Sequence, residues 1–175
     1  SQLDLEKQHA ASVSRACASA LAAASTQGGS PAPGLADFRQ ACVDYLVWIL
    51  TRFEEREQVF HDLLRARLPS DDPQRRAAEG ALATAGSSRE ALAKLETALG
   101  SDGTARWNDF LQFFTQAWSQ RRDELDRLFA QHAKTTDWRT VSAIDADSIF
   151  DERHRYARVQ AALPVGVELN ATVRA

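Results

Sequence analysis

The chain has 175 residues, a formal net charge of −3 and a hydrophobic fraction of 44%. This length suits one domain with a substantial core. The acidic balance argues against a nucleic-acid partner, which normally selects a basic surface. The longest unbroken apolar run, YLVWIL at 45–50, is too short to span a membrane. Two cysteines do not make a disulfide scaffold, so we expect a cytoplasmic protein; the first residue is Ser1, which leaves a removed leader open.

The residue types favour helices throughout. Ala, Leu, Arg, Glu and Gln dominate and β-branched residues are few, which predicts an all-α fold. Segments rich in Gly and Pro separate the patterned stretches, and Ser70 or Asp71/Asp72 before Pro73 has the form of a helix start. Ser87-x-x-Glu90 and Ser148-x-x-Asp151 have the form of further helix caps, the first of which predicts a break in the third helix. We expect helices over about 3–25, 35–68, 73–99, 104–134 and 148–163.

Long helices with short polar connections predict an antiparallel up-down four-helix bundle. Residues 1–163 form this single domain in our interpretation, and the additional C-terminal helix docks outside the bundle or across one end. Residues 164–175 are expected to be a tail.

The helix at 35–68 has the strongest apolar pattern and one interruption. Apolar residues recur at helical spacing from Phe38 to Phe53 and resume at Phe60. Between them the same face falls on Arg56 or Glu57. A charge on a face this apolar requires a partner.

The apolar patterns of the other helices are also interrupted by polar residues, at a similar height along the predicted bundle. In an antiparallel bundle, His9, Ser88/Arg89 and Arg121/Arg122 fall near the level of Arg56/Glu57. One interpretation is a polar layer that binds a small anionic ligand, as helical bundles build such sites between facing helices. The favoured interpretation is structural, with charges paired inside the fold, for example Glu57 with Arg121. The candidate layer consists of His9, Arg52, Arg56, Glu57, Arg89, Arg121 and Arg122.

Histidines and cysteines provide weaker signals. Glu6-x-x-His9 and Asp151-x-x-His154 have the spacing found in di-metal carboxylate bundles, but an acid near a histidine is common in a chain with 24 acidic residues. A structural or surface role for each histidine is therefore favoured. Cys17 and Cys42 face each other in the predicted bundle, as two packed thiols in the favoured interpretation and as a redox pair in the other. The chain contains no nucleophile, phosphate-loop or dinucleotide-binding motif.

The segments EKQH (6–9), TRFEEREQVF (51–60) and RRDELDRLF (121–129) resemble a hemerythrin-type (HHE) domain. That family is an up-down four-helix bundle with a non-haem di-iron centre. The resemblance implies His9, Glu54 or Glu55, and Glu124 as metal ligands. The histidines that the family has four residues earlier are replaced by Leu50 or Thr51 and by Gln120, and residues 73–99 contain no histidine. The implied metal site is therefore degenerate.

A second resemblance is local. The segment DFRQACVDYL (37–46) is similar to the second helix of the anti-sigma regulators typified by the regulator of sigma D. These proteins are helical bundles that bind the surface of a transcription factor.

Three functions follow as expectations. The first is a non-enzymatic binding or regulatory module of hemerythrin-like shape, without a cofactor, whose partner is a small anionic ligand or a protein. The second is a bundle that binds iron or manganese, in which the last helix adds Asp151 or His154. The third is an anti-sigma-like regulator that acts through an exposed helix face. The oligomeric state is left open.

Overall fold

The computed structural model describes residues 1–26, 34–99, 104–132 and 138–169. Within these residues the chain is all-α, with five helices and no strand, as the composition predicts. The helices are α1 (Gln2–Thr26), α2 (Leu35–Arg67), α3 (Pro73–Leu99), α4 (Thr104–His132) and α5 (Trp138–Ala161). The expected bounds of the first four agree closely with these, whereas α5 begins well before residue 148. The expected stops at 27–33 and 100–103 lie outside the described residues.

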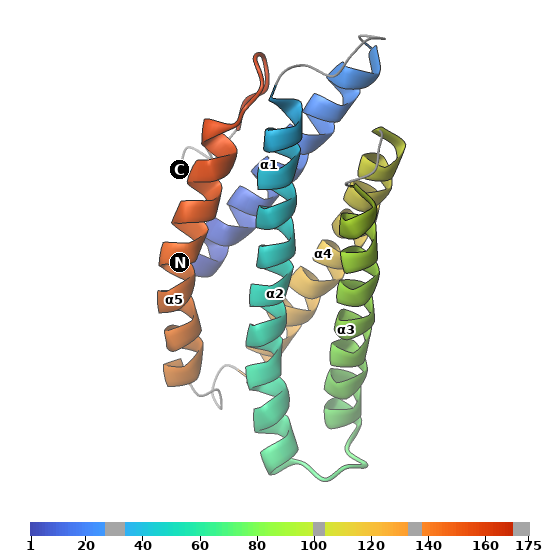
Figure 1. Cartoon of the computed structure of the whole chain (residues 1–175). Helices are drawn as coiled ribbons and strands as arrows, with labels where there is room; N and C mark the ends of the chain where they lie inside the picture. The colour runs from blue at the N-terminus through green and yellow to red at the C-terminus, as the bar shows by residue number, and fades with distance from the viewer. Residues whose placement is uncertain (27–33, 100–103, 133–137, 170–175) are drawn as a thin grey trace.

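The α2 helix lies at the centre of the fold, because it packs against each of the other four helices. Figure 1 shows α5 and α3 on opposite sides of α2, with α1 and α4 behind it. In addition, α4 packs against both α1 and α3, so that α1 to α4 form a ring of neighbours. These contacts are consistent with a helical bundle, and α5 joins it by packing against α1 and α2.

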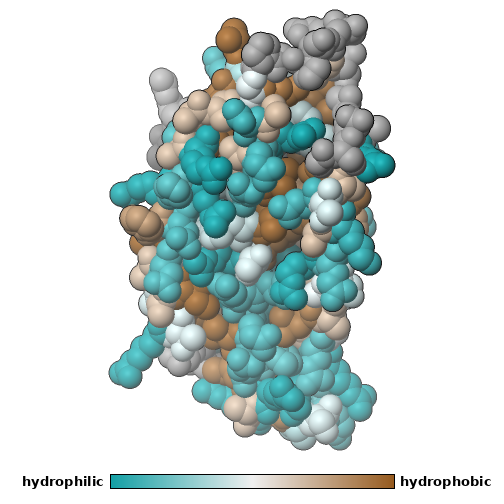
Figure 2. Space-filling model, viewed as in Figure 1, coloured by the Kyte–Doolittle hydropathy of each residue, from teal (hydrophilic) through white to brown (hydrophobic). Residues whose placement is uncertain are grey.

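Aromatic residues fill the space around α2. Phe38, Phe53 and Phe60 of α2 are fully buried, and the ring of Phe53 lies 4.6 Å from that of Trp118 on α4. Their helical spacing places them on the faces that α2 turns toward its neighbours. The predicted apolar pattern of the second and fourth helices is therefore confirmed. Figure 2 shows the complementary surface, with hydrophilic residues over most of the visible face and hydrophobic residues in smaller areas among them.

The start of α3 agrees with its sequence signal. Asp72 and Gln74 lie directly before and directly after Pro73. The backbone N–H of Gln74 donates a hydrogen bond of 2.8 Å to Oδ1 of Asp72. An aspartate in this position satisfies a backbone donor that has no partner within the helix.

The expected break in α3 at Ser87 is wrong. The helix runs without interruption from Pro73 to Leu99, with Ala85 and Leu92 buried on either side of the GSS segment. These apolar residues hold the helix against the bundle. Gly86 and its neighbours are tolerated because packing outweighs their weak helix propensity.

The expected start of the fifth helix is also wrong. Ser148 is no cap but a buried residue inside α5. The face of α5 toward the bundle has aliphatic residues only at its two ends and residues with polar groups between them, so a hydrophobicity pattern does not reveal its helical period. That face consists of Val141, Asp145, Ser148, Glu152, Tyr156 and Val159.

Part of the expected tail packs on the bundle. Val167 is buried and Leu169 packs against the core. Gly166 has a φ of 82°, a left-handed conformation that suits glycine at the turn before Val167. Residues 170–175 lie outside the described residues. No helix in the described part of the chain has the length and apolar character needed to cross a bilayer.

Candidate functional site

The first buried polar cluster joins α1, α2 and α5. Arg56 is fully buried and donates from Nη1 to Oε2 of Glu6, at 2.7 Å. It also donates from Nε and Nη2 to Oδ1 of Asp145, at 3.0 and 2.9 Å. The charge on the central helix thus has two carboxylate partners, one from each neighbouring helix. Such a pair is costly to break, because the remaining charge stays buried.

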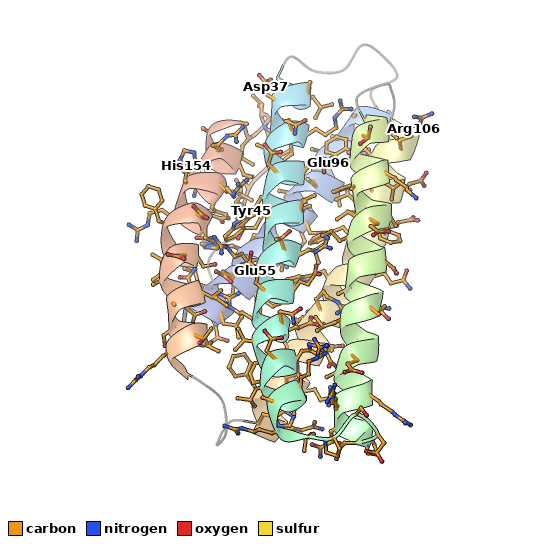
Figure 3. All side chains as sticks on the ribbon, turned by 60° about the horizontal axis from the view of Figure 1, so that its bottom comes forward. Asp37, Tyr45, Glu55, Glu96, Arg106 and His154 are labelled. Carbon is orange, nitrogen blue, oxygen red and sulfur yellow. The ribbon has the colours of Figure 1, made fainter. Side chains whose placement is uncertain are left out.

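Two turns further along α5, a second set of contacts connects the same three helices. His9 of α1 pairs with Glu152 of α5, and the hydroxyl of Tyr45 on α2 donates to Oε1 of Glu152 at 3.0 Å. The His9 ring stacks on Tyr156, with ring centroids 3.8 Å apart and an interplanar angle of 8°. Figure 3 shows Tyr45 between α2 and α5. Burial, together with the Glu152 charge, raises the pKa of both tyrosines, so they remain neutral donors.

The other side of α2 carries a separate ion pair. Arg121 of α4 donates from Nη1 to Oε2 of Glu57, at 2.8 Å, and to the carbonyl of Ala81 on α3, at 3.0 Å. Both charged residues are buried. The predicted pairing of Glu57 with Arg121 is confirmed, and it links α2, α3 and α4.

The positive charge of Arg121 does not fully offset the effect of burial on the pKa of Glu57. Burial raises the pKa of Glu57 to about 8, opposed by the Arg121 charge and reinforced by Glu124 and Glu54. Glu54 pairs with Arg89 of α3 at 2.8 Å, and Glu124 pairs with Arg127 of its own helix. The cluster is therefore rich in carboxylates around one buried arginine, which favours the protonated form of Glu57 more than in water.

The residues of the predicted polar layer therefore divide between the two sides of α2. His9 and Arg56 lie on the side of α1 and α5, whereas Glu57 and Arg121 lie on the side of α3 and α4. The remaining members form pairs nearer the surface: Arg52 with Glu55 and Asp151, Arg89 with Glu54, and Arg122 with Asp123. A single layer that converges on one ligand is not what the structure shows.

The ligands implied by the hemerythrin resemblance also lie apart. His9 contacts Glu152, Glu54 contacts Arg89, Glu55 contacts Arg52, and Glu124 contacts Arg127. Among the described residues, no three histidine, cysteine or carboxylate side chains are arranged to hold a metal ion. His9 and Glu54 connect different pairs of helices, whereas Glu55 and Glu124 pair within their own helices.

The cysteines are as close as their facing positions predict. Cys17 of α1 and Cys42 of α2 are both buried, both free, and in hydrogen-bond contact through their thiols. Burial and the neighbouring Cys17 thiol raise the pKa of Cys42. The pair consists of unreactive packed thiols rather than activated nucleophiles.

Several members of the buried clusters escape prediction from sequence. Glu6 and Glu152 complete the two α1–α2–α5 contacts, yet each looks like an ordinary surface acid in the sequence. The signal for Glu6 is its place between Leu3 and Ala10 on the apolar face of α1. Some buried polar atoms have no hydrogen-bond partner among the described residues: Trp48 Nε1, Glu57 Oε1, Trp107 Nε1, Arg121 Nε, Ser148 Oγ and Tyr156 OH.

Two hollows lie near these elements. A groove of about 630 Å³ lies where the start of α2 meets the end of α5, with Asp37, Arg158 and Leu163 among its lining residues. A much smaller cavity, of about 10 Å³, lies beside Glu54, Arg89 and Arg121. The small cavity has room for a water molecule at most.

Exposed apolar side chains gather on α5. Phe150 is 77% exposed and Ile149 is 44% exposed. On the same face, Asp147 and Arg153 form no ion pair within the described part of the chain.

No family model matches the chain, and no curated protein or solved structure is significantly similar to it. The resemblances to hemerythrin-type domains and to anti-sigma regulators therefore stay predictions.

Proposed function

We propose that this chain is a non-enzymatic helical-bundle module that binds a protein through the outer face of α5. In this proposal its shape is hemerythrin-like, with α1 to α4 in antiparallel up-down order, and the metal site of that family is degenerate. The ring of contacts among α1 to α4 supports the bundle order.

Exposed Phe150 carries the proposal. A phenylalanine that is 77% exposed gains about 2 kcal/mol or more from burial against a partner. Asp147 and Arg153 lie one turn to either side and add charges that can select the partner.

The buried charges support a structural interpretation of the interior. Arg56 has Glu6 and Asp145 as partners, and Arg121 has Glu57 and the Ala81 carbonyl. Because each guanidinium is engaged by an element of the fold, an anionic ligand would have to displace a buried carboxylate. These clusters hold the helices together, so in this proposal the partner binds at the surface of the protein.

The test compares three proteins purified from the natural host without added metal: the wild type, Phe150→Glu and Val165→Glu. Val165 is fully exposed outside α5 and provides the matched control. Native mass spectrometry should show a stoichiometric complex for the wild type and V165E, and its loss in F150E. Elemental analysis of the same samples should find iron and manganese far below one ion per chain.

Three outcomes contradict the proposal. Stoichiometric iron or manganese would establish the di-metal alternative. A complex that survives in F150E would place binding elsewhere, and a wild-type protein that neither retains a partner nor self-associates up to 1 mM would exclude the binding role. A complex with a transcription factor would establish the anti-sigma-like form of the same proposal.

A further inference from the structure

The outer face of α5 has an internal symmetry about Phe150. This residue lies at the middle of the helix Trp138–Ala161. Three residues before it is Asp147 and three residues after it is Arg153, while Ala143 and Ala157 lie seven residues away on either side. All five side chains are exposed. Spacings of three, four and seven residues place them on one stripe of the helix.

This arrangement is complementary to itself. When two antiparallel helices cross at one residue, each residue before the crossing faces a residue equally far after it on the other helix. Asp147 would then face Arg153 of a second copy, and His154 beside it, and the same contacts would recur on the other side of the two-fold axis. The two Phe150 rings would meet at the centre, and the alanines would let the helices approach closely.

We propose that the protein α5 binds is a second copy of this chain, in an antiparallel pair of α5 helices with Phe150 on the two-fold axis. The inference rests on the proposed binding role of the outer face of α5. Asp147 in the first half of the stripe and Arg153 in the second half favour this occupant over an unrelated partner, because a reversed copy of the same helix brings each of these two charges opposite its counterpart.

The interior of the fold leaves this stripe free for a second copy. The opposite face of α5, which contains Asp145, Glu152 and Tyr156, is committed to α1 and α2. One helix of 24 residues buries less area than a standard stable interface of about 1,200 Å² or more. We therefore expect a dimer that dissociates on dilution, and the measurements span about 5 μM to 1 mM.

The charge pairs provide a sharp test by sedimentation equilibrium. Asp147→Arg places two arginines opposite each other at both ends of the pair, and Arg153→Asp does the same with two acids. Each single variant should weaken dimerisation by about tenfold. The double variant D147R/R153D restores both contacts and should dimerise within about threefold of the wild type. Phe150→Glu should abolish dimerisation, and Val165→Glu should leave it unchanged.

Cross-linking tests the geometry with the stripe intact. Ala143→Cys and Ala157→Cys are mixed and treated with a short bis-maleimide. The mixture should give a covalent dimer, because residues 143 and 157 face each other across the pair. Either variant alone should give none, because two copies of residue 143 would lie about 20 Å apart. The native cysteines are buried and stay unmodified under these conditions.

Several results overturn the inference. One is a wild-type protein that stays monomeric up to 1 mM. Another is a double charge variant no better than the single ones, and a third is equal cross-linking of A143C alone and of the mixture. If the complex of the wild type contains a different protein and is still lost in F150E, the binding role of α5 stands and only the second copy is excluded. If F150E forms the same complex as the wild type, the proposed function itself fails.

Discussion

Arg56 and Glu57 are consecutive residues of α2, and their side chains enter two different buried ion-pair clusters. Arg56 reaches Glu6 and Asp145 on the side of α1 and α5, and Glu57 reaches Arg121 on the side of α4. Successive residues of a helix point about 100° apart, so one charged dipeptide connects the central helix to both halves of the bundle. The charges that interrupt the apolar pattern of α2 thus act as helix-to-helix contacts.

Replacing Arg56 should be among the most destabilising changes in the chain. Arg56→Met removes a fully buried cation and leaves Glu6, which is also fully buried, without its charged partner and with only the Gln2 amide as a side-chain donor among the described residues. We expect a loss of about 3–5 kcal/mol in the free energy of unfolding, measured by urea denaturation. The double variant E6Q/R56M should recover part of this loss. Arg89→Met, which removes a half-exposed arginine, should cost less than about 1 kcal/mol; equal losses for R56M and R89M would contradict this account.

Glu57 should make stability depend on pH. Its pKa is raised from the ordinary value of 4.5 to about 8 in the fold, mainly by burial. The folded state therefore keeps a proton that the unfolded state loses, so the contribution to stability is complete below pH 4.5 and is lost as pH rises through 8. The loss should be on the order of a few kcal/mol between about pH 5 and 9.

Glu57→Gln should flatten this dependence, since the amide does not titrate and can still accept from Arg121. The free energy of unfolding, measured by urea denaturation at several pH values, is the readout. The control is Glu90→Gln, at an exposed position of α3, which should keep the wild-type slope. A slope that survives in E57Q would assign the dependence to another group.

Replacement by alanine should have opposite effects on the stability of the protein at two glycines. Gly86 lies inside α3 and a Cβ there meets nothing within 4 Å, so Gly86→Ala should stabilise the protein by about 0.5–1 kcal/mol. Gly34, before α2, has a φ of 85°, and Gly34→Ala should destabilise by about 1 kcal/mol or more. Thermal unfolding of both variants gives the readout. Destabilisation by G86A would mean that α3 is interrupted there, as the sequence predicts.

The two thiols should resist modification in the native state. Cys17 and Cys42 are buried, and burial raises the pKa of Cys42, so little thiolate forms. At pH 7, an aromatic disulfide reagent should label both thiols only as fast as the protein opens. In concentrated urea both thiols should react at once. Rapid labelling of one thiol in the native protein would show that it is accessible.

The sequence predicts the parts of this fold in which apolar residues alone decide the pattern. Helix ends next to Pro73 and the aromatic faces of α2 and α4 belong to this part. The sequence does not predict α5 correctly, because the face of α5 toward the bundle contains Asp145, Ser148 and Glu152. Asp145 and Glu152 face the bundle because α1 and α2 supply Arg56, His9 and Tyr45 as their partners. A partner more than 80 residues away in the chain leaves no local signal in the sequence.

The candidate site shows the same division. The pairing of Glu57 with Arg121 is predictable, because each interrupts an otherwise apolar helix face at the same height. The separation of His9 and Arg56 from that pair is not, since it depends on the position of α5. The exposure of Phe150 cannot be predicted from the sequence either, because there it is one more apolar residue beside Ile149.

The central position of α2 has a consequence for how the molecule opens. Because α2 contacts every other helix, no helix can leave the bundle without uncovering part of it, but α5 and α3 flank it on opposite sides. We expect native-state hydrogen exchange to divide the protein into cooperative units, with the amides of α5 and α3 opening independently and those of α2 near Phe53 exchanging only on global unfolding.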